Sequence, residues 1–204
     1  MDKINNLMDK LLKLVPGGYY GLLSMVIGVI FTFLSYLLVP GYNMIESFIS
    51  VLGISPGLAA PLFNIGFILT GITVIPFLVY LGRSLTQEKI NEKIKKFAIK
   101  ISIIGAISIS LVGCFPHYTL LLGIIHIFFA TIFFFCELIF CTIYSILIWI
   151  DSRFSKMQTI IGFAVSGVFI FFIFTGWPIS EWMVFFAIVF WVIENSIYFL
   201  YKKI

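Results

Sequence analysis

The sequence predicts an all-α integral membrane protein whose six transmembrane helices form a single bundle, and three observations support this. The chain of 204 residues is 61% hydrophobic and 11% charged, whereas soluble domains carry about 25% charged residues. Its apolar residues form six uninterrupted runs of at least about 18 residues, the length that crosses a bilayer. Its basic residues all fall on one side of the membrane once these runs are threaded through it.

The six apolar runs are expected to be helices, because backbone polar groups in lipid must be satisfied within their own segment. None has the short alternating pattern of barrel strands. The first run is too long for the apolar core of a signal peptide and lacks a small-residue cleavage site, so we expect it to remain as a span. Within one domain covering 1–204, the expected spans are 19–38, 57–82, 97–114, 119–150, 159–177 and 182–201.

The basic residues predict the orientation of the chain. All 13 Lys and Arg residues precede the first span, lie between spans two and three or at the inner end of span three, join spans four and five, or follow the last span. The positive-inside rule then predicts a multi-pass protein of the cell membrane with its N- and C-termini in the cytoplasm. The same bias accounts for the net charge of +4, so the charge gives no indication of a nucleic-acid partner.

The connections between the spans differ in character. The turns at 115–118 and 178–181 are short, which makes the spans that they join antiparallel neighbours. The basic segment 83–96 has helical spacing and is expected to extend span three, with a solvated charged surface as the alternative. Within the apolar outer connection, residues 44–53 are expected to form a short helix in the outer interface or over the mouth of the bundle. A packed structural loop is the alternative there.

The fourth span carries two ionisable residues, His126 and Glu137, in an otherwise apolar run. They are eleven residues apart, which is almost three helical turns, so they share a face at a separation of about 16 Å along the axis. Lipid penalises charge, so that face should point into the bundle. Ionisable residues within a membrane are functional candidates, but helix-to-helix hydrogen bonds and protonated acids are structural alternatives.

Further polar residues occur at matching depth in the outer half of the bundle. Asn64 lies about 10 Å below the outer edge of span two, level with His126. We expect an outer-leaflet pocket that binds a lipid headgroup, formed by Asn64, Ser108, Ser110 and His126 and roofed by Glu46, Ser50 and His117. If the protein is an enzyme, His126 is the candidate catalytic acid–base group, because imidazole titrates near neutrality.

Glu194 is a second intramembrane acid, in the inner half of span six. Lys100 is the nearest basic residue by depth, and it is expected either to pair with Glu194 or to extend toward the headgroups. A relay through His126, Glu137 and Glu194 would suit proton-coupled transport.

Several functional classes lack their sequence signatures. The chain contains no P-loop and no arginine within a span. Its cysteines, Cys114, Cys136 and Cys141, have no metal-ligand spacing and are expected to be buried apolar residues. We therefore expect no metal and no cofactor.

A set of short motifs has a recognisable order and spacing. A Ser-x-Leu-Gly element follows span one, a Phe-Asn pair and two glycines occur in span two, a Phe-Pro turn follows span three, and a histidine lies in span four. The residues that carry these motifs are Ser50, Leu52, Gly53, Phe63, Asn64, Gly66, Gly71, Phe115, Pro116 and His126. Over about residues 15–200 the pattern resembles domain of unknown function 998, an uncharacterised family of archaeal and bacterial membrane proteins.

The resemblance implies a function only by analogy. The family often has an acid after the Ser-x-Leu-Gly serine, where this chain has Val51, although Glu46 is available as a substitute. The family is distantly similar to DRAM-type six-span proteins, which implies a lipid-related role. The leading hypothesis is therefore that the protein binds or remodels a membrane lipid or a lipid-linked headgroup. The alternatives are a proton-coupled small-solute transporter and a non-catalytic membrane scaffold.

Overall fold

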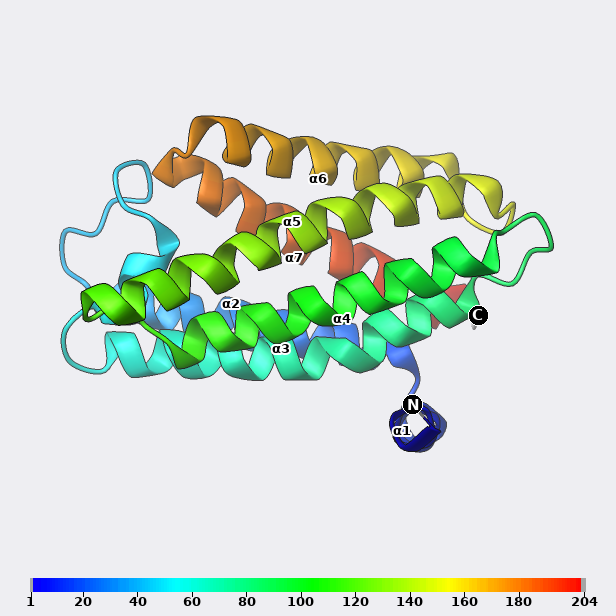
Figure 1. Ribbon diagram of the computed structural model, residues 1–204, viewed down its shortest axis with the longest axis horizontal. Helices are drawn as coiled ribbons and strands as arrows, with labels where there is room; N and C mark the ends of the chain where they lie inside the picture. Colours follow the sequence, from blue (N-terminus) through cyan, green and yellow to red (C-terminus); the bar gives the residue numbers. More distant parts are fainter. Residues whose placement is uncertain (1, 203–204) are drawn as a thin grey trace.

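The computed structural model describes residues 2–202 and shows an all-helical chain (Figure 1). Six of its helices are long and apolar enough to cross a membrane, which confirms the predicted fold class. A 3₁₀ helix, η1 (Ile49–Ile54), lies between the first two of them. The α-helices are α1 (Asp2–Leu14), α2 (Gly17–Leu37), α3 (Ala59–Ser84), α4 (Glu92–Cys114), α5 (Leu120–Ile150), α6 (Lys156–Thr175) and α7 (Pro178–Lys202).

The ends of the spans are set by local signals in the sequence. The Asn91 side chain accepts hydrogen bonds from the first turn of α4, so this helix begins at Glu92, before the predicted span at 97. The basic segment extends the span only from residue 92, because residues 85–91 are not helical. Ser155 and Gln158 form a capping box at the start of α6. Gly176 ends α6 with a left-handed backbone, φ 59°, a conformation that glycine adopts at little cost.

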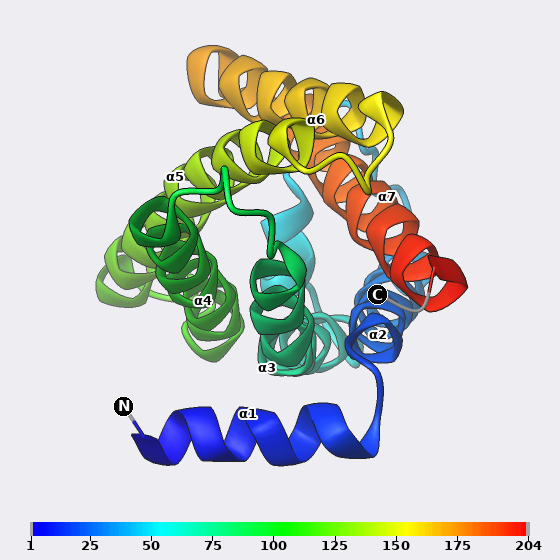
Figure 2. The ribbon, with the colours of Figure 1, turned by 90° about the vertical axis from the view of Figure 1, so that its right-hand side faces the viewer.

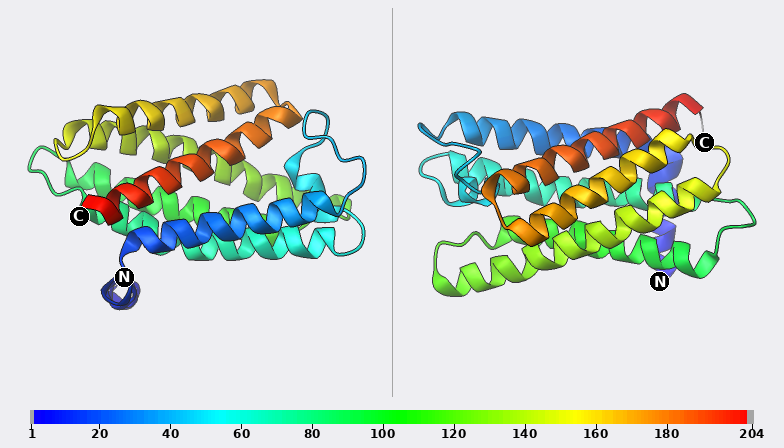
Figure 3. Two further views of the ribbon diagram at one scale, coloured as in Figure 1. Left: turned by 180° about the vertical axis from the view of Figure 1, so that it is seen from behind. Right: turned by 90° about the horizontal axis from the view of Figure 1, so that it is seen from above.

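The six long helices form a closed ring in chain order (Figure 2). Each helix from α2 to α7 packs against the next, and α7 returns to pack against α2, as the side views also show (Figure 3). The described Lys and Arg residues lie toward the end of the ring that carries both chain termini, which we call the basic end. The opposite end carries η1, and we call it the η1 end.

The outer connection differs from the expected interfacial helix. Residues 44–48 form turns and an extended stretch, and only Ile49–Ile54 is helical, as a 3₁₀ helix. This segment folds over the end of the bundle, where Leu52 is completely buried and packs with Phe63 and Trp182. Two hydrogen bonds hold the residues before η1 in place. Trp182 Nε1 donates to Tyr42 Oη at 3.3 Å, and Tyr42 Oη donates to the Phe48 carbonyl at 2.6 Å. The segment thus lies over the bundle mouth, mostly as a packed loop with one 3₁₀ helix in place of a helix over 44–53.

The N-terminal helix α1 was not predicted. It lies crosswise on the outside of the ring, near the basic end and beside α3 (Figure 2). Met8 on its apolar face is buried, whereas Leu7 and Leu14 are exposed. Asp9 pairs with Arg83 of α3 at 2.5 Å, and Tyr20 of α2 donates to the Leu11 carbonyl at 3.2 Å. An amphipathic helix in this position has the geometry of an interfacial helix.

Small residues allow the long helices to approach closely. Gly71 of α3 faces α4 so tightly that an added β-carbon would overlap the Ala106 carbonyl oxygen and the Ser110 hydroxyl. At the α2–α7 contact, a β-carbon on Gly18 would lie 2.7 Å from the Ser196 carbonyl oxygen. Glycine at such positions is typical of packed membrane helices.

We expect Gly71→Ala to lower the free energy of unfolding by about 1–3 kcal/mol, because the two helices must separate to admit the methyl group. Gly167→Ala is the matched control, since a β-carbon there meets nothing within 4 Å. That substitution should leave stability unchanged or raise it by up to about 1 kcal/mol, because alanine favours helix over glycine. Unfolding by SDS in mixed micelles measures both, and equal effects would show that the α3–α4 approach is not tight.

Candidate functional site

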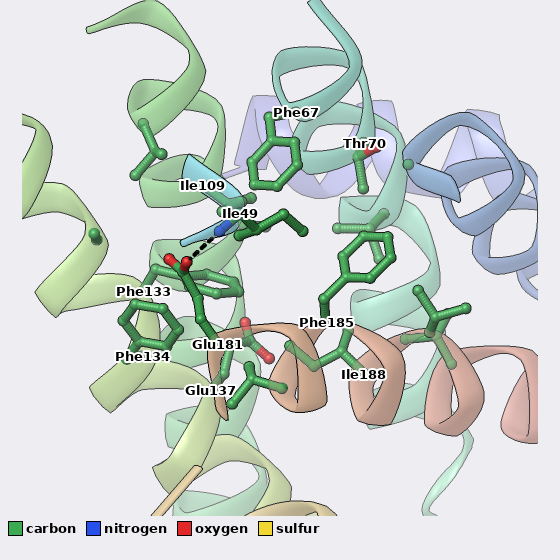
Figure 4. Close-up of a pocket in the computed structure, with 18 of the residues that line it drawn as sticks. Ile49, Phe67, Thr70, Ile109, Phe133, Phe134, Glu137, Glu181, Phe185 and Ile188 are labelled. Carbon is green, nitrogen blue, oxygen red and sulfur yellow. Dashed lines mark hydrogen bonds between the residues drawn. The ribbon is translucent and has the colours of Figure 1, made fainter. Parts of the chain in front are cut away.

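The ring encloses a cavity of about 120 Å³ that runs inward from η1 (Figure 4). Its walls come from α2, α3, α4, α5, α7 and η1, and α6 contributes none of the lining residues. Most of the lining is aliphatic or aromatic, including Phe67, Ile109, Phe133, Phe185 and Ile188. The ionisable side chains in the lining, apart from Cys141, are His126, Glu137 and Glu181.

Glu137 is the acid of the cavity lining that lies furthest from η1. It lies in the middle of α5 with 7% of its surface exposed, and Figure 4 shows its carboxyl group among the apolar side chains of the cavity. On one side the carboxyl abuts Gly105 of α4, where an added β-carbon would overlap Glu137 Oε1. No group within residues 2–202 makes a hydrogen bond or an ion pair with this carboxyl.

Glu181 connects the cavity to η1. It lies in the first turn of α7, and its Oε2 accepts a hydrogen bond from the Ile49 backbone N–H at 2.7 Å, with the Ser50 backbone beside it (Figure 4). Glu181 was not predicted as a site residue, because the sequence placed it in the short connection between spans five and six, where acids are ordinarily exposed. In the structure it belongs to the first turn of α7, which lies beneath η1, so the side chain is half-buried.

His126 lines the cavity nearer the η1 end, with 7% of its surface exposed. Its Nδ1 lies 3.0 Å from the Phe115 carbonyl oxygen, and its ring centroid is 5.1 Å from that of His117. His117 lies in the turn outside the spans, where burial lowers the pKa of its imidazole. The His117 ring is therefore neutral near pH 7, and its buried Nδ1 has no hydrogen-bond partner in the described part of the chain.

The structure brings together some of the residues predicted for the pocket and separates others. Ser50, His126 and Glu137 line the cavity. Asn64 lies beside it and donates from Nδ2 to the Gly53 carbonyl at 2.9 Å, so its amide holds η1 in place. Ser110 donates to the Ile68 carbonyl at 3.2 Å. The predicted residues that lie outside the lining are Asn64, Ser108, Ser110, Glu46 and His117.

Glu194 lies apart from this cavity. It is on the part of α7 near the basic end, in a separate surface depression with Tyr198 and Tyr201. The Gln158 side chain of α6 lies near its carboxyl group, and Lys100 is exposed. Of the two alternatives for Lys100, the pairing with Glu194 is not observed, and Glu194 does not line the cavity with His126 and Glu137. Within residues 2–202, no group of three metal-ligating side chains comes together.

The comparison with known families agrees with the motif order in the sequence. A family described as "Protein of unknown function (DUF998)" matches residues 22–194, which is most of the chain. The chain belongs to this family. The match covers all the helices that line the cavity except the first residues of α2 and the last of α7, which confirms the resemblance. The searches of curated proteins and of solved structures gave no match.

The geometry limits what this member of the family does chemically at the site. The apolar walls suit an alkyl or isoprenoid chain, and the two carboxyl groups offer hydrogen-bond acceptors. The only imidazole in the lining is His126, whose Nδ1 faces a backbone carbonyl and not a carboxylate. The cavity thus combines apolar walls with two carboxyl groups and one imidazole.

Proposed function

We propose that the protein binds a membrane lipid, with its apolar chain against the apolar walls of the cavity and its polar group near the carboxyl groups of the lining. The observation that carries this proposal is the apolar lining of the cavity, interrupted by Glu137 and Glu181. Ligand sites are concave and mostly apolar, with a few placed polar groups that orient the ligand. The site meets each of these criteria.

The size of the cavity favours binding over a purely structural role. Helical cores are packed to the density of organic crystals. At roughly 24 cal/mol per Å³, a cavity of 120 Å³ would cost about 3 kcal/mol if nothing filled it. A scaffold gains nothing in return for that cost, whereas a lipid that fills the cavity offsets it.

The distribution of acids favours binding over transport. A proton path needs ionisable groups through the whole depth of the membrane. Glu194, which would continue such a path toward the basic end, lies in a separate depression. The polar groups of the cavity are instead confined to the part between η1 and the middle of α5.

The same proposal includes the orientation of the protein. The described Lys and Arg residues gather toward one end of the bundle, and the positive-inside rule assigns that end to the cytoplasm of the cell membrane. The η1 end would then face outward, and the lipid would be drawn from the outer leaflet.

Filling the cavity tests the proposal. Ala130 lines the cavity, and Ala130→Phe should reduce the amount of co-purified lipid at least about tenfold, because the ring occupies the volume of the chain. Ala164→Phe is the matched control, since Ala164 is exposed on α6, outside the cavity. Native mass spectrometry of protein from mild detergent measures lipid adducts. Equal adducts in both variants and the wild type would contradict binding in this cavity.

A further inference from the structure

Acidic and basic residues lie at opposite ends of the bundle, and this distribution restricts the charge of the ligand. Toward the η1 end, the charged residues of the described chain are Glu46 and Glu181, both acidic. Glu137 adds a third carboxyl group inside the cavity. No Lys or Arg side chain is among the residues that line the cavity, because the described basic residues lie toward the opposite end.

Two of the described basic residues, one of them the buried Lys95, have acidic partners at the basic end. Lys95 pairs with Glu92 at 2.5 Å, and Arg153 pairs with Asp151 at 2.6 Å. Neither is available as a counterion for Glu137. The Glu137 carboxyl is more than nine-tenths buried, faces the cavity and has no protein partner within residues 2–202. A buried carboxylate without a counterion is costly, and the cost is relieved either by protonation or by a cationic partner from outside the protein.

The lining restricts the chemistry of that partner. An anionic or phosphate-bearing headgroup would meet carboxyl groups and no basic side chain, so like-charge repulsion disfavours it. An inorganic cation such as Ca²⁺ needs several oxygen ligands that converge on one point, and within residues 2–202 no three His, Cys, Asp or Glu side chains converge in this way. An alkylammonium ion satisfies both parts of the site, because its N–H groups donate to the carboxyl groups and its chain contacts the apolar walls.

We propose that the ligand is a cationic amphiphile, an apolar chain bearing a protonated amine and no anionic group, with the amine bound at Glu137. This inference rests on the proposed lipid-binding function and specifies its ligand class. Glu181 adds negative potential between Glu137 and η1, and its Oε2 remains bonded to the Ile49 N–H. Glu137 is then the residue that determines specificity for the amine, and the apolar walls provide affinity for the chain.

Three ligands with the same ten-carbon chain test the inference: decylamine, 1-decanol and decanoic acid. Each is titrated into the purified protein in detergent micelles at pH 7, and native mass spectrometry gives the concentration at half occupancy. We expect decylamine to bind at least about tenfold more tightly than decanol, the ratio typical of a hydrogen bond to a charged group. Decanoate should bind most weakly. Equal binding of amine and alcohol, or no binding of any of the three, would overturn the inference.

Two substitutions locate the amine. Glu137→Gln should bring the amine-to-alcohol ratio to about one, whereas Glu194→Gln, in the separate depression, should leave it as in the wild type. Gly105→Ala is a second variant that keeps the carboxyl group but displaces it from its position against α4, and it should also reduce the ratio. An amine preference that persists in both Glu137→Gln and Gly105→Ala would refute the assignment.

The test of the cationic ligand and the test of the lipid site can fail independently of each other. Lipid that is lost in Ala130→Phe, together with equal binding of decylamine and decanol, would retain the lipid site and reject the cationic ligand. Lipid that is unaffected by Ala130→Phe would reject the cavity as a lipid site, whichever ten-carbon ligand binds.

Discussion

Replacing Asp151 by alanine is expected to lower the free energy of unfolding by about 2–4 kcal/mol, the largest single effect outside the cavity. The Asp151 side chain is fully buried and accepts two hydrogen bonds from the Arg153 guanidinium, at 2.9 Å to Oδ1 and 2.6 Å to Oδ2, and a third from the Arg153 backbone N–H at 3.1 Å. Arg153 also donates to the Ser84 carbonyl at 2.5 Å and accepts the Tyr198 hydroxyl through its own carbonyl. Loss of Asp151 leaves the guanidinium, which is about one-third exposed, without its counterion.

The matched control is Asp9→Ala. Asp9 pairs with Arg83 at 2.5 Å, but their side chains are 52% and 37% exposed. Exposed ion pairs contribute at most about 1 kcal/mol, so this variant should unfold in SDS at nearly the same concentration as the wild type. If Asp151→Ala were no more destabilising than Asp9→Ala, the α5–α6 connection would not fasten the basic end.

The effect of Asp151 should depend on pH in a known direction. Burial raises the pKa of Asp151, but the hydrogen bonds and the positive charge of Arg153 lower it by more than burial raises it. The net pKa therefore lies below its usual value of 3.8. A depressed carboxyl pKa stabilises the folded state above the usual value, and this stabilisation is lost as the pH falls through the folded pKa. The difference between wild type and Asp151→Ala should therefore be full at pH 7 and should shrink below about pH 3.8.

Replacing Glu181 by alanine is expected to release η1 from the end of the bundle. The substitution removes the acceptor of the Ile49 N–H and the carboxyl beside Ser50. A buried N–H left without a partner costs about 1–3 kcal/mol, and local opening becomes easier by a similar amount. Hydrogen exchange at Ile49 and Ser50 should accelerate at least about tenfold.

Glu46→Ala provides the control for Glu181, because Glu46 lies in the same outer connection but is exposed. Exchange of η1 amides in this variant should match the wild type, and so should exchange in α6 of both variants. Unchanged exchange at Ile49 in Glu181→Ala would show that Leu52 and its neighbours hold η1 without the carboxyl group.

The transmembrane architecture was predictable from sequence because the bilayer imposes it directly. A span must be long, continuous and apolar, and each of the six predicted spans overlaps an observed helix. The helix α1 obeys a different rule. It is short and carries polar residues on one face, so a search for continuous apolar runs does not detect it, and only its amphipathic spacing at Leu7, Met8 and Leu11 indicates a helix.

The site was only partly predictable, because depth along a helix does not determine which way a side chain points. The eleven-residue spacing placed His126 and Glu137 on one interior face, and both are buried and line the cavity. Asn64 lies at the same depth as His126. Successive side chains on a helix differ in direction by about 100°, and the Asn64 side chain points toward Gly53, not into the cavity. Glu181 was missed because its burial depends on η1, which reaches it from 132 residues away in the chain.

The contact between α2 and α7 differs from the other contacts of the ring, because no connection joins these two helices directly. Gly18 meets Ser196 across nearly the whole length of the chain, so this contact carries the largest loop-closure entropy and is expected to form last in folding. Glu181, Phe185 and Ile188 of the cavity lining all belong to α7, so we expect the cavity to be complete only once this contact has formed. A ligand that contacts both α5 and α7 would then stabilise the closed ring by its binding free energy.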